Sequence, residues 1–276
     1  MCEIATESFV VVAAAESRAY SNPLGVHSLV WCGEWDEAAA RRAAVGSAAA
    51  GFNLVEIPAF DAARLDGRMT RRVLEEHGLA AATSLGLTLD SDISSEDKEV
   101  VARGVAALED ALRFSADAGA RHMCGILYSA LAKYPGPPTA AGRANAAAAL
   151  RGLASKASDL GVALCLEVVN RYETNLLNTA AQAAAFVDEV DHPNVFIHLD
   201  TYHMHIEEVS MGAAVQAAGS RLRYIHMGES HRGYLGTGSV DFQGLFEALA
   251  AAGYAGPITF ESFSSAVVSE QLSNTL

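Results

Sequence analysis

From residue 24 onward, the sequence alternates between short apolar runs and longer stretches rich in alanine. Such runs are typical of buried strands, and the stretches between them are long enough for helices. The runs are LGVHSLV (24–30), FNLVEI (52–57), LAAATSLG (79–86), RHMCGIL (121–127), VALCLEV (162–168), NVFIHLD (194–200), LRYIHM (222–227) and PITFES (257–262). The helix candidates include 36–50, 96–118, 141–160, 179–190 and 241–252. Eight strands that alternate with helices predict an α/β fold, a single-domain (β/α)8 TIM barrel.

Capping residues support several of these helix candidates. Asp36, Thr139, Asn178 and Asp241 stand where a helix N-cap is expected, and side chains of these types accept hydrogen bonds from the first turn. The alternative fold is a doubly wound open sheet, which needs a glycine-rich nucleotide-binding turn early in the chain. The stretch GVHSLVWCG is not such a turn, so the barrel is favoured.

The two ends of the chain do not follow the alternating pattern. Residues 1–22 are interpreted as an N-terminal extension of unknown role, and 23–276 as the barrel. The run FVVVAAA resembles a short signal core, but Glu3 and Glu7 precede it where a signal peptide has positive charge. After the eighth strand only SSAVVSEQLSNTL remains, so we expect a truncated eighth helix.

Net charge restricts the kinds of partner. The chain of 276 residues carries a formal net charge of −14 at pH 7. An acidic surface repels nucleic acids and anionic membranes, and no apolar run approaches the roughly 18 residues that cross a bilayer. We therefore expect a small neutral or cationic substrate and no nucleic-acid or membrane partner.

The cysteines indicate the compartment. Cys2, Cys32, Cys124 and Cys165 form no CxxC pair, and we interpret them as reduced packing residues. This interpretation predicts a cytoplasmic protein, although the N-terminal extension leaves an organellar location open.

Four consecutive strands end in a residue that can bind a metal ion. Glu167, Asp200, His226 and Glu261 follow one another at intervals of 26 to 35 residues, about one strand–helix unit each. In a TIM barrel the carboxyl ends of the strands form the active-site rim. Three carboxylates and one imidazole suit Mn²⁺, Mg²⁺ or Co²⁺ better than a structural zinc ion. The alternative is four separate polar residues with local hydrogen bonds, but their common position at the strand ends argues against it.

Three further polar residues fall in the loops above this rim. Glu173 follows the fifth strand, His203 the sixth and Arg232 the seventh. Each lies where a ligand above the barrel would bind. For His203 the alternative is a packed loop histidine, with His205 or His231 in its place, and for Arg232 it is a solvated surface charge.

A long part of the sequence resembles a known family. The stretch LCLEVVNRYETNLLNTAAQAAAFVDEVDHPNVFIHLDTYHMHIEE is similar to the ketose 3-epimerases, such as D-tagatose 3-epimerase and D-allulose (D-psicose) 3-epimerase. These enzymes belong to the xylose isomerase-like TIM barrel superfamily. The likeness continues in HMGESHRGYLGTGSVDF, in FESFSS and in the early stretches GVHSLVWCGEWDE and GFNLVEIP. It covers residues 24 to about 270.

The resemblance implies a cofactor and a set of site residues. It implies one divalent metal ion per subunit, with Mn²⁺ first and Mg²⁺ or Co²⁺ as alternatives. The residues that match the family's metal ligands are Glu167, Asp200, His226 and Glu261. Those that match its contacts to the C1 to C3 end of an open-chain ketose are Glu173, His203 and Arg232. His27 stands where many relatives have an aromatic residue, and it is a further candidate for substrate binding. The family also implies a homo-oligomer, a dimer or a tetramer.

The implied reaction is inversion of C3 in a free ketose, of the D-fructose/D-allulose or D-tagatose/D-sorbose type. The proton at C3 is next to the C2 carbonyl, and its removal gives a cis-enediolate that a metal ion stabilises. Inversion needs one acid/base group on each face of C3, and Glu167 and Glu261 leave different strands to flank it.

Three other functions stay open at this point. Two are enzymatic on the same barrel: a sugar-phosphate epimerase that binds phosphate at the loop GYLGTGS, and a hydroxypyruvate-type isomerase. The third is a non-catalytic, metal-dependent sugar-binding protein. Abasic-site DNA nucleases share the barrel, but the charge of −14 disfavours them.

Overall fold

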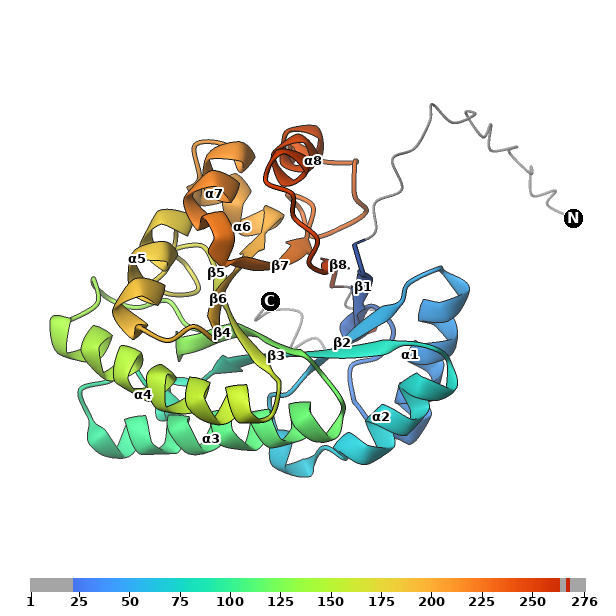
Figure 1. The fold of residues 1–276 in the computed structure, drawn as a ribbon, viewed down its shortest axis with the longest axis horizontal. Helices are drawn as coiled ribbons and strands as arrows, with labels where there is room; N and C mark the ends of the chain where they lie inside the picture. Colours follow the sequence, from blue (N-terminus) through green and yellow to red (C-terminus); the bar gives the residue numbers. More distant parts are fainter. Residues whose placement is uncertain (1–21, 264–266, 269–276) are drawn as a thin grey trace, which may run out of the picture.

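The computed structural model describes residues 22–263 and 267–268, and the structural statements below concern these residues. In this part of the chain, eight parallel strands close into a barrel that helices surround (Figure 1). The fold predicted from the sequence, a (β/α)8 TIM barrel, is therefore confirmed. The predicted N-terminal extension, except Asn22, and most of the segment predicted as a truncated eighth helix lie outside the described residues.

The strands follow one another around the barrel in chain order, and β8 closes the ring by pairing with β1. They are β1 (Leu24–His27), β2 (Leu54–Pro58), β3 (Ala80–Leu87), β4 (His122–Ala130), β5 (Ala163–Val168), β6 (Val195–Asp200), β7 (Leu222–Met227) and β8 (Ile258–Phe260). Because all are parallel, their carboxyl ends share one rim. The register places Asp200 beside His226, and Glu167 beside His198. Neighbouring strands thus bring these side chains within reach of one another.

The helices lie outside the barrel (Figure 1). They are α1 (Glu37–Ala49), α2 (Gly67–Glu76), α3 (Lys98–Asp117), α4 (Ala140–Asp159), α5 (Ala180–Val190), α6 (Thr201–Glu207), α7 (Met211–Ala218) and α8 (Phe242–Ala251). The sequence pattern did not single out α2, α6 or α7. Of these, α6 and α7 have only seven and eight residues, too few for a clear helical period.

Three of the four predicted N-caps are confirmed and one is wrong. Asp36, Thr139 and Asp241 each accept a backbone hydrogen bond from the first turn of their helix. The N-cap of α5 is Thr179 instead of Asn178, because Thr179 forms a reciprocal capping box with Gln182. The Asn178 amide donates to two loop carbonyl groups.

The first strand is shorter than predicted. The apolar run 24–30 predicts a strand over its whole length, but β1 ends at His27 and Ser28–Val30 form a short 3-10 helix. The His27 ring explains this end, because its Nδ1 accepts a hydrogen bond from the Leu29 N–H at 3.3 Å.

Small side chains let the helices pack closely on the barrel. Ala40 and Ala44 of α1 have no exposed surface. Cys32, Cys124 and Cys165 are buried free thiols, in agreement with their interpretation as packing residues.

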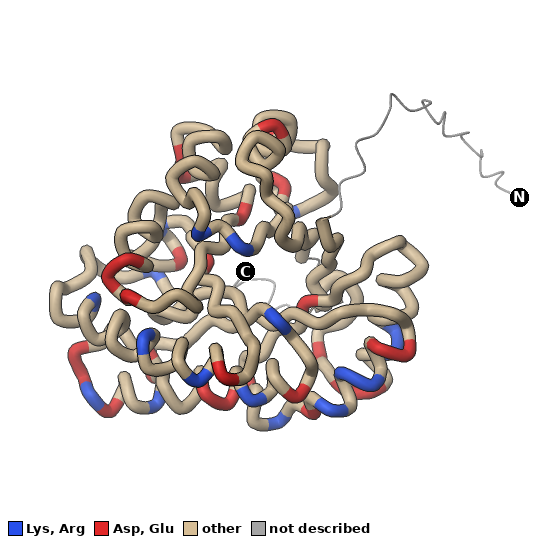
Figure 2. Tube along the Cα trace, viewed as in Figure 1, with Lys and Arg blue, Asp and Glu red and all other residues tan. Residues whose placement is uncertain are grey.

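The outer helices carry charges of both signs (Figure 2). Arg41 of α1 pairs with Glu37 on its own helix and with Glu76 on α2. Such exposed pairs contribute little to stability. Among the described helices, none is long and apolar enough to cross a membrane.

Candidate active site

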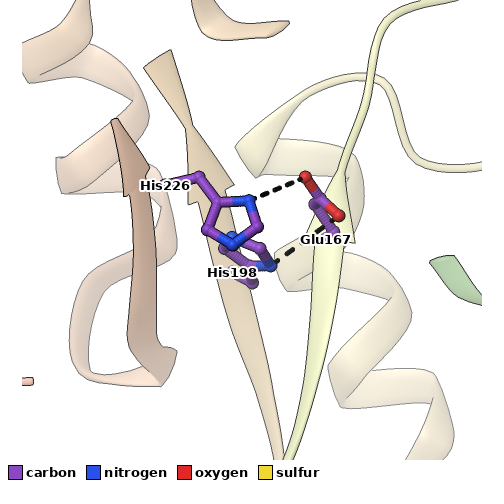
Figure 3. Close-up of side chains that lie close together, drawn as sticks. All are labelled: Glu167, His198 and His226. Atoms are coloured by element: carbon purple, nitrogen blue, oxygen red, sulfur yellow. Dashed lines mark ion pairs between the residues drawn. The ribbon is translucent and has the colours of Figure 1, made fainter. Parts of the chain in front are cut away.

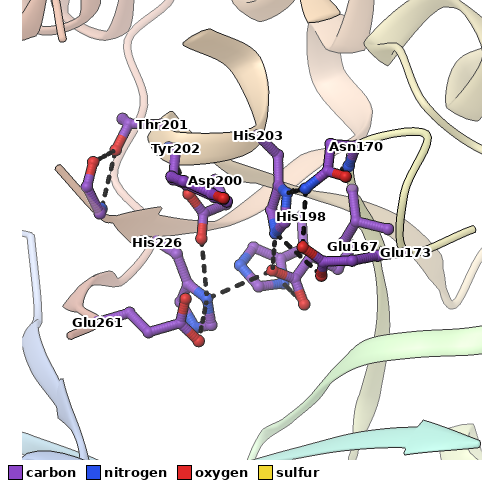
Figure 4. Close-up of polar contacts among 12 residues, drawn as sticks. Glu167, Asn170, Glu173, His198, Asp200, Thr201, Tyr202, His203, His226 and Glu261 are labelled. Atoms are coloured by element: carbon purple, nitrogen blue, oxygen red, sulfur yellow. Dashed lines mark hydrogen bonds and ion pairs between the residues drawn. The ribbon is translucent and has the colours of Figure 1, made fainter. Parts of the chain in front are cut away.

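The four strand-end residues predicted as metal ligands converge at the rim (Figure 4). Glu167, Asp200, His226 and Glu261 each offer a ligand atom, and these atoms all lie within 4.8 Å of one another. All four side chains are buried. Burial of three carboxylates without positive charge is unfavourable, so the cluster needs positive charge from a cation, from protons or from a basic side chain beside it.

One nitrogen of His226 faces the three carboxylates. Its Nδ1 lies 3.3 Å from Glu261 Oε1, 3.5 Å from Glu167 Oε1 and 3.8 Å from Asp200 Oδ2. Within the described part of the chain, Nδ1 has no hydrogen-bond partner. Burial acts to lower the pKa of His226, but Glu56 and Glu261 raise it well above its usual value. The position of Nδ1 therefore favours a positive charge, which a proton or a metal ion can supply.

The other nitrogen of His226 is held by Glu56 of β2. Glu56 Oε2 lies 2.8 Å from His226 Nε2, and Glu56 has no exposed surface. Burial acts to raise the pKa of Glu56, but His226 and His27 lower it to about 2. Glu56 is thus an anion that accepts a hydrogen bond from the Nε2–H group of His226. Nδ1 is then left to bind a cation, which is the usual arrangement for metal-binding histidines.

These observations fit a divalent metal ion. The donor set has three carboxylates and one imidazole and contains no thiolate, which suits Mn²⁺, Mg²⁺ or Co²⁺. Burial raises the pKa of Asp200 well above its usual value. Burial also acts to raise the pKa of Glu261, but His226 and Arg232 lower the pKa of that carboxyl group. The four residues therefore form a candidate metal site.

Arg232 reaches the same cluster from the loop after β7. Its Nη1 forms an ion pair with Glu261 Oε2 and lies 3.4 Å from Asp200 Oδ2. The guanidinium carbon lies 4.1 Å from the centre of the Tyr202 ring, a favourable cation–π distance. The predicted substrate-binding arginine thus lies directly beside two of the candidate metal ligands.

His203 presents a hydrogen-bond donor to the space beside Arg232. Its Nδ1 accepts the backbone N–H of Asn170 at 3.1 Å, so the neutral ring carries its proton on Nε2. This Nε2 lies 3.2 Å from Arg232 Nη2 and 3.8 Å from Glu173 Oε2. Two N–H groups cannot hydrogen-bond to each other. His203 and Arg232 can instead both donate to one acceptor oxygen that lies between them and the cavity.

Glu173 lies beside His203, next to the position that such an acceptor oxygen would take. The Asn170 amide donates a hydrogen bond to its Oε1 at 2.7 Å. Burial raises the pKa of Glu173 to about 7, against the lowering effect of Arg232. At neutral pH its carboxyl group can therefore donate or accept a hydrogen bond.

A cavity lies at the cluster, and Glu167, Glu173, His203, His226, Arg232 and Glu261 line it. Its apolar lining consists of Leu29, Phe60, Leu85, Ile126, Leu131, Val169 and Phe263. His27 and Ser84 also line the cavity, with His27 Nε2 at 3.3 Å from Ser84 Oγ. The structure thus brings together all eight residues predicted for the site.

Known proteins show the same combination of fold and sequence. The chain matches the xylose isomerase-like TIM barrel family over residues 46–274. It is 52% identical over 252 residues to the L-ribulose 3-epimerase of Methylomonas sp. (strain DH-1), covering 91% of this chain and 88% of that relative. It is also 52% identical over 253 residues to the ketose 3-epimerase of Arthrobacter globiformis, covering 92% and 88%. The chain belongs to the ketose 3-epimerase family.

A solved structure agrees with this membership. The crystal structure of D-allulose 3-epimerase from Methylomonas sp. in complex with D-allulose matches with a TM-score of 0.90 and 51% identity, over 92% of this chain and 88% of that chain. As a ketose 3-epimerase family member, the chain is an enzyme of the isomerase class. The family recognised in the sequence is therefore confirmed.

Sequence reasoning missed two residues of the candidate site. Glu56 stands one residue before the end of the apolar run FNLVEI, the same position that Glu167 has in VALCLEV. His198 lies on β6 with its ring 4.1 Å from that of His226, edge to face. Its Nδ1 is 3.9 Å from Glu167 Oε2 (Figure 3). The period of two along the strand, which puts His198 and Asp200 on one face, could have found it.

His198 could in principle share the metal site. With Glu167 and His226 it forms a second group of three possible ligands. Burial lowers the pKa of His198 well below its usual value, so the ring is neutral. The group of four contains three carboxylates and only one nitrogen ligand, and it is the better match for a hard divalent ion.

Proposed function

We propose that this chain catalyses the metal-dependent epimerisation of free ketoses at C3, of the D-fructose/D-allulose and D-tagatose/D-sorbose type. The observation that carries the proposal is the placement of Glu167 and Glu261. Each has a carboxylate oxygen within 3.5 Å of His226 Nδ1. Glu167 comes from β5 and Glu261 directly follows β8, and both side chains extend toward His226 in Figure 4.

This placement suits proton transfer on both faces of C3. When bound, a divalent ion polarises the C2 carbonyl and stabilises the negative charge that forms as the C3 proton leaves. One of the two glutamates removes that proton from one face of the sugar. The other returns a proton to the opposite face of the cis-enediolate, which completes the inversion. The two carboxylates exchange roles when the reaction runs backwards.

Glu167, Asp200, His226 and Glu261 would hold the ion, with Mn²⁺ as the first candidate. Three oxygen ligands and one nitrogen also suit Mg²⁺ and Co²⁺. Glu56 would keep His226 in the tautomer that binds.

Arg232 and His203 would hold the reacting end of the sugar. Both direct N–H groups toward one place, which an oxygen on C1 to C3 of the ketose can occupy. Glu173 would hydrogen-bond to a neighbouring hydroxyl group. His27 would contact the sugar from beside the metal cluster, because its ring centre lies 6.3 Å from that of His226.

Two features support free sugars over sugar phosphates. Asp241 caps α8 through the Gly244 N–H at 2.9 Å, which places a negative charge where a phosphate would bind a helix N-terminus. Within the described residues, no lysine lines the cavity. A phosphate substrate would therefore meet Arg232 alone, and that side chain already pairs with two carboxylates.

A substrate panel tests the proposal. Metal-free protein would be incubated with D-fructose, D-allulose, D-tagatose, D-sorbose, L-ribulose and D-fructose 6-phosphate, with and without Mn²⁺, and the products separated by chromatography. We expect 3-epimers from free ketoses, only with Mn²⁺. Conversion of the phosphate alone, full activity without metal, or binding of ketoses without any turnover would contradict the proposal.

We also propose that the protein is a homo-oligomer, a dimer or a tetramer. The family resemblance supports this assembly, and Val209 and Tyr234 are two strongly exposed apolar side chains that a subunit contact would cover. Sedimentation velocity at micromolar concentration tests this, and a stable monomer would contradict it.

A further inference from the structure

The loop between β7 and α8 is built around a buried carboxylate. Glu229 has no exposed surface, and it is neither a candidate metal ligand nor a lining residue of the cavity. Its Oε1 accepts the backbone N–H groups of Ser230 at 2.8 Å and Val240 at 3.2 Å. Its Oε2 accepts the Gly236 N–H at 2.8 Å. One side chain therefore joins the beginning, the middle and the end of the loop.

The loop wraps this carboxylate closely. A Cβ atom added to Gly238 would clash with Ser230 Oγ and Glu229 Oε1, so only glycine fits there without a shift. Burial acts to raise the pKa of Glu229, but the surrounding backbone N–H groups, of Ser230, Val240 and Gly236 among others, lower it to about 2. The group is thus an anion at neutral pH, and backbone donors that converge on an anion form a stable arrangement.

Arg232 is the residue that this loop presents to the cavity. Its backbone has a φ of 59°, in the left-handed region that residues other than glycine rarely adopt. Its N–H donates to the Glu229 carbonyl oxygen at 2.8 Å, and its own carbonyl accepts from Ser262 Oγ at 2.6 Å. A strained conformation of this kind persists only when its surroundings hold it.

We propose that Glu229 is a positioning residue for Arg232. Its carboxylate fixes the shape of the loop, the loop holds the Arg232 backbone in its left-handed conformation, and the guanidinium is thereby kept between Tyr202 and the carboxylates of Asp200 and Glu261. The inference rests on the proposed function, in which Arg232 binds the ketose.

Glu229→Gln is the informative change, because it keeps the size of the side chain. The amide NH₂ group would face a backbone N–H, so at least one of the three hydrogen bonds is lost and a donor meets a donor. We expect kcat/KM for D-allulose to fall about tenfold or more, mainly through KM, with Mn²⁺ still bound. Glu247→Gln, on the exposed face of α8, is the matched control and should leave kcat/KM unchanged.

A double-mutant cycle separates positioning of Arg232 from a general loss of structure. Arg232→Ala removes the group that Glu229 is inferred to position. In that background, Glu229→Gln should cost less than about twofold further, because residues that act through one another give non-additive losses. Additive losses, or an unchanged kcat/KM in Glu229→Gln, would overturn the inference.

Two further results keep the test decisive. If Glu229→Gln does not fold, as judged by near-UV circular dichroism, Gly238→Ala disturbs the same carboxylate from the loop side and should show the same non-additivity with Arg232→Ala. If Arg232→Ala leaves kcat/KM unchanged, the proposed role of Arg232 in the function is itself wrong, and the inference falls with it. If only Arg232→Ala has an effect, the proposed function stands and the inference alone is wrong.

Discussion

Glu56 on β2 and His226 on β7 meet inside the barrel rim, with Glu56 Oε2 at 2.8 Å from His226 Nε2 and both side chains buried. This contact leaves His226 Nδ1 directed at three carboxylates. The contact therefore determines which nitrogen of the imidazole can bind a cation, and it does so without a bound cation. A buried carboxylate behind a metal-binding histidine also makes the ring a stronger ligand.

Replacement of Glu56 should weaken metal binding. Glu56→Gln keeps the shape of the side chain but removes the negative charge behind His226. We expect the dissociation constant for Mn²⁺ to rise about 10- to 100-fold, measured by isothermal titration calorimetry without substrate. Glu75→Gln, an exposed glutamate on α2, is the control. Equal Mn²⁺ affinity in Glu56→Gln and wild type would show that Glu56 has no part in the metal site.

Metal binding should also raise thermal stability. A ligand that binds only the folded state at 100 times its dissociation constant contributes about 2.7 kcal/mol, which corresponds to roughly 5–10 °C in Tm for a domain of this size. Addition of Mn²⁺ to metal-free protein should give a shift of this order in a calorimetric scan. Asp200→Ala should reduce the shift strongly, because it removes one of the proposed ligands. An equal shift in both proteins would place the ion elsewhere.

The strand pattern made much of this site predictable. The carboxyl ends of parallel strands share one rim, so Glu167, Asp200, His226 and Glu261 could be grouped once the apolar runs were recognised. Glu56 was not grouped with them, although it stands one residue before the end of FNLVEI as Glu167 does in VALCLEV. Sequence alone does not say which side chains of a buried run point into the barrel.

Residue patterns failed where a hydrogen bond from a side chain to nearby backbone decides. Asn178 and Thr179 are both good N-caps, and the choice between them depends on loop carbonyl groups that Asn178 bonds instead. The end of β1 depends on the His27 ring bonding to the Leu29 N–H. The role inferred for Glu229 depends on three backbone groups of a loop whose folded shape no residue pattern indicates.

Stability should depend on pH through His122, at the start of β4. Burial and the nearby Arg223 and Arg121 lower the pKa of His122 to about 4, against about 6.5 in an unfolded chain. Between these values the unfolded chain binds a proton that the folded protein does not, so folding is destabilised as pH falls from about 6.5 toward 4.

The change His122→Asn should remove this part of the pH dependence. Between pH 7.5 and pH 5, the wild type should lose about 2 kcal/mol more unfolding free energy than the variant, measured by urea denaturation. The comparison is between slopes, so a uniform loss of stability in the variant does not affect it. Parallel pH profiles would contradict the assignment.

Hydrogen exchange at C3 tests the central claim, that Glu167 and Glu261 act on opposite faces of the sugar. Glu167→Gln and Glu261→Gln, with Mn²⁺ occupancy checked by elemental analysis, would be incubated with D-fructose and with D-allulose in deuterated water. Each variant should lose about 10²-fold or more of its turnover. Each should still exchange the C3 hydrogen of one sugar without forming the other, and the two variants should prefer opposite sugars. If both variants exchange the same sugar equally well, one base serves both faces and the two-glutamate account is wrong.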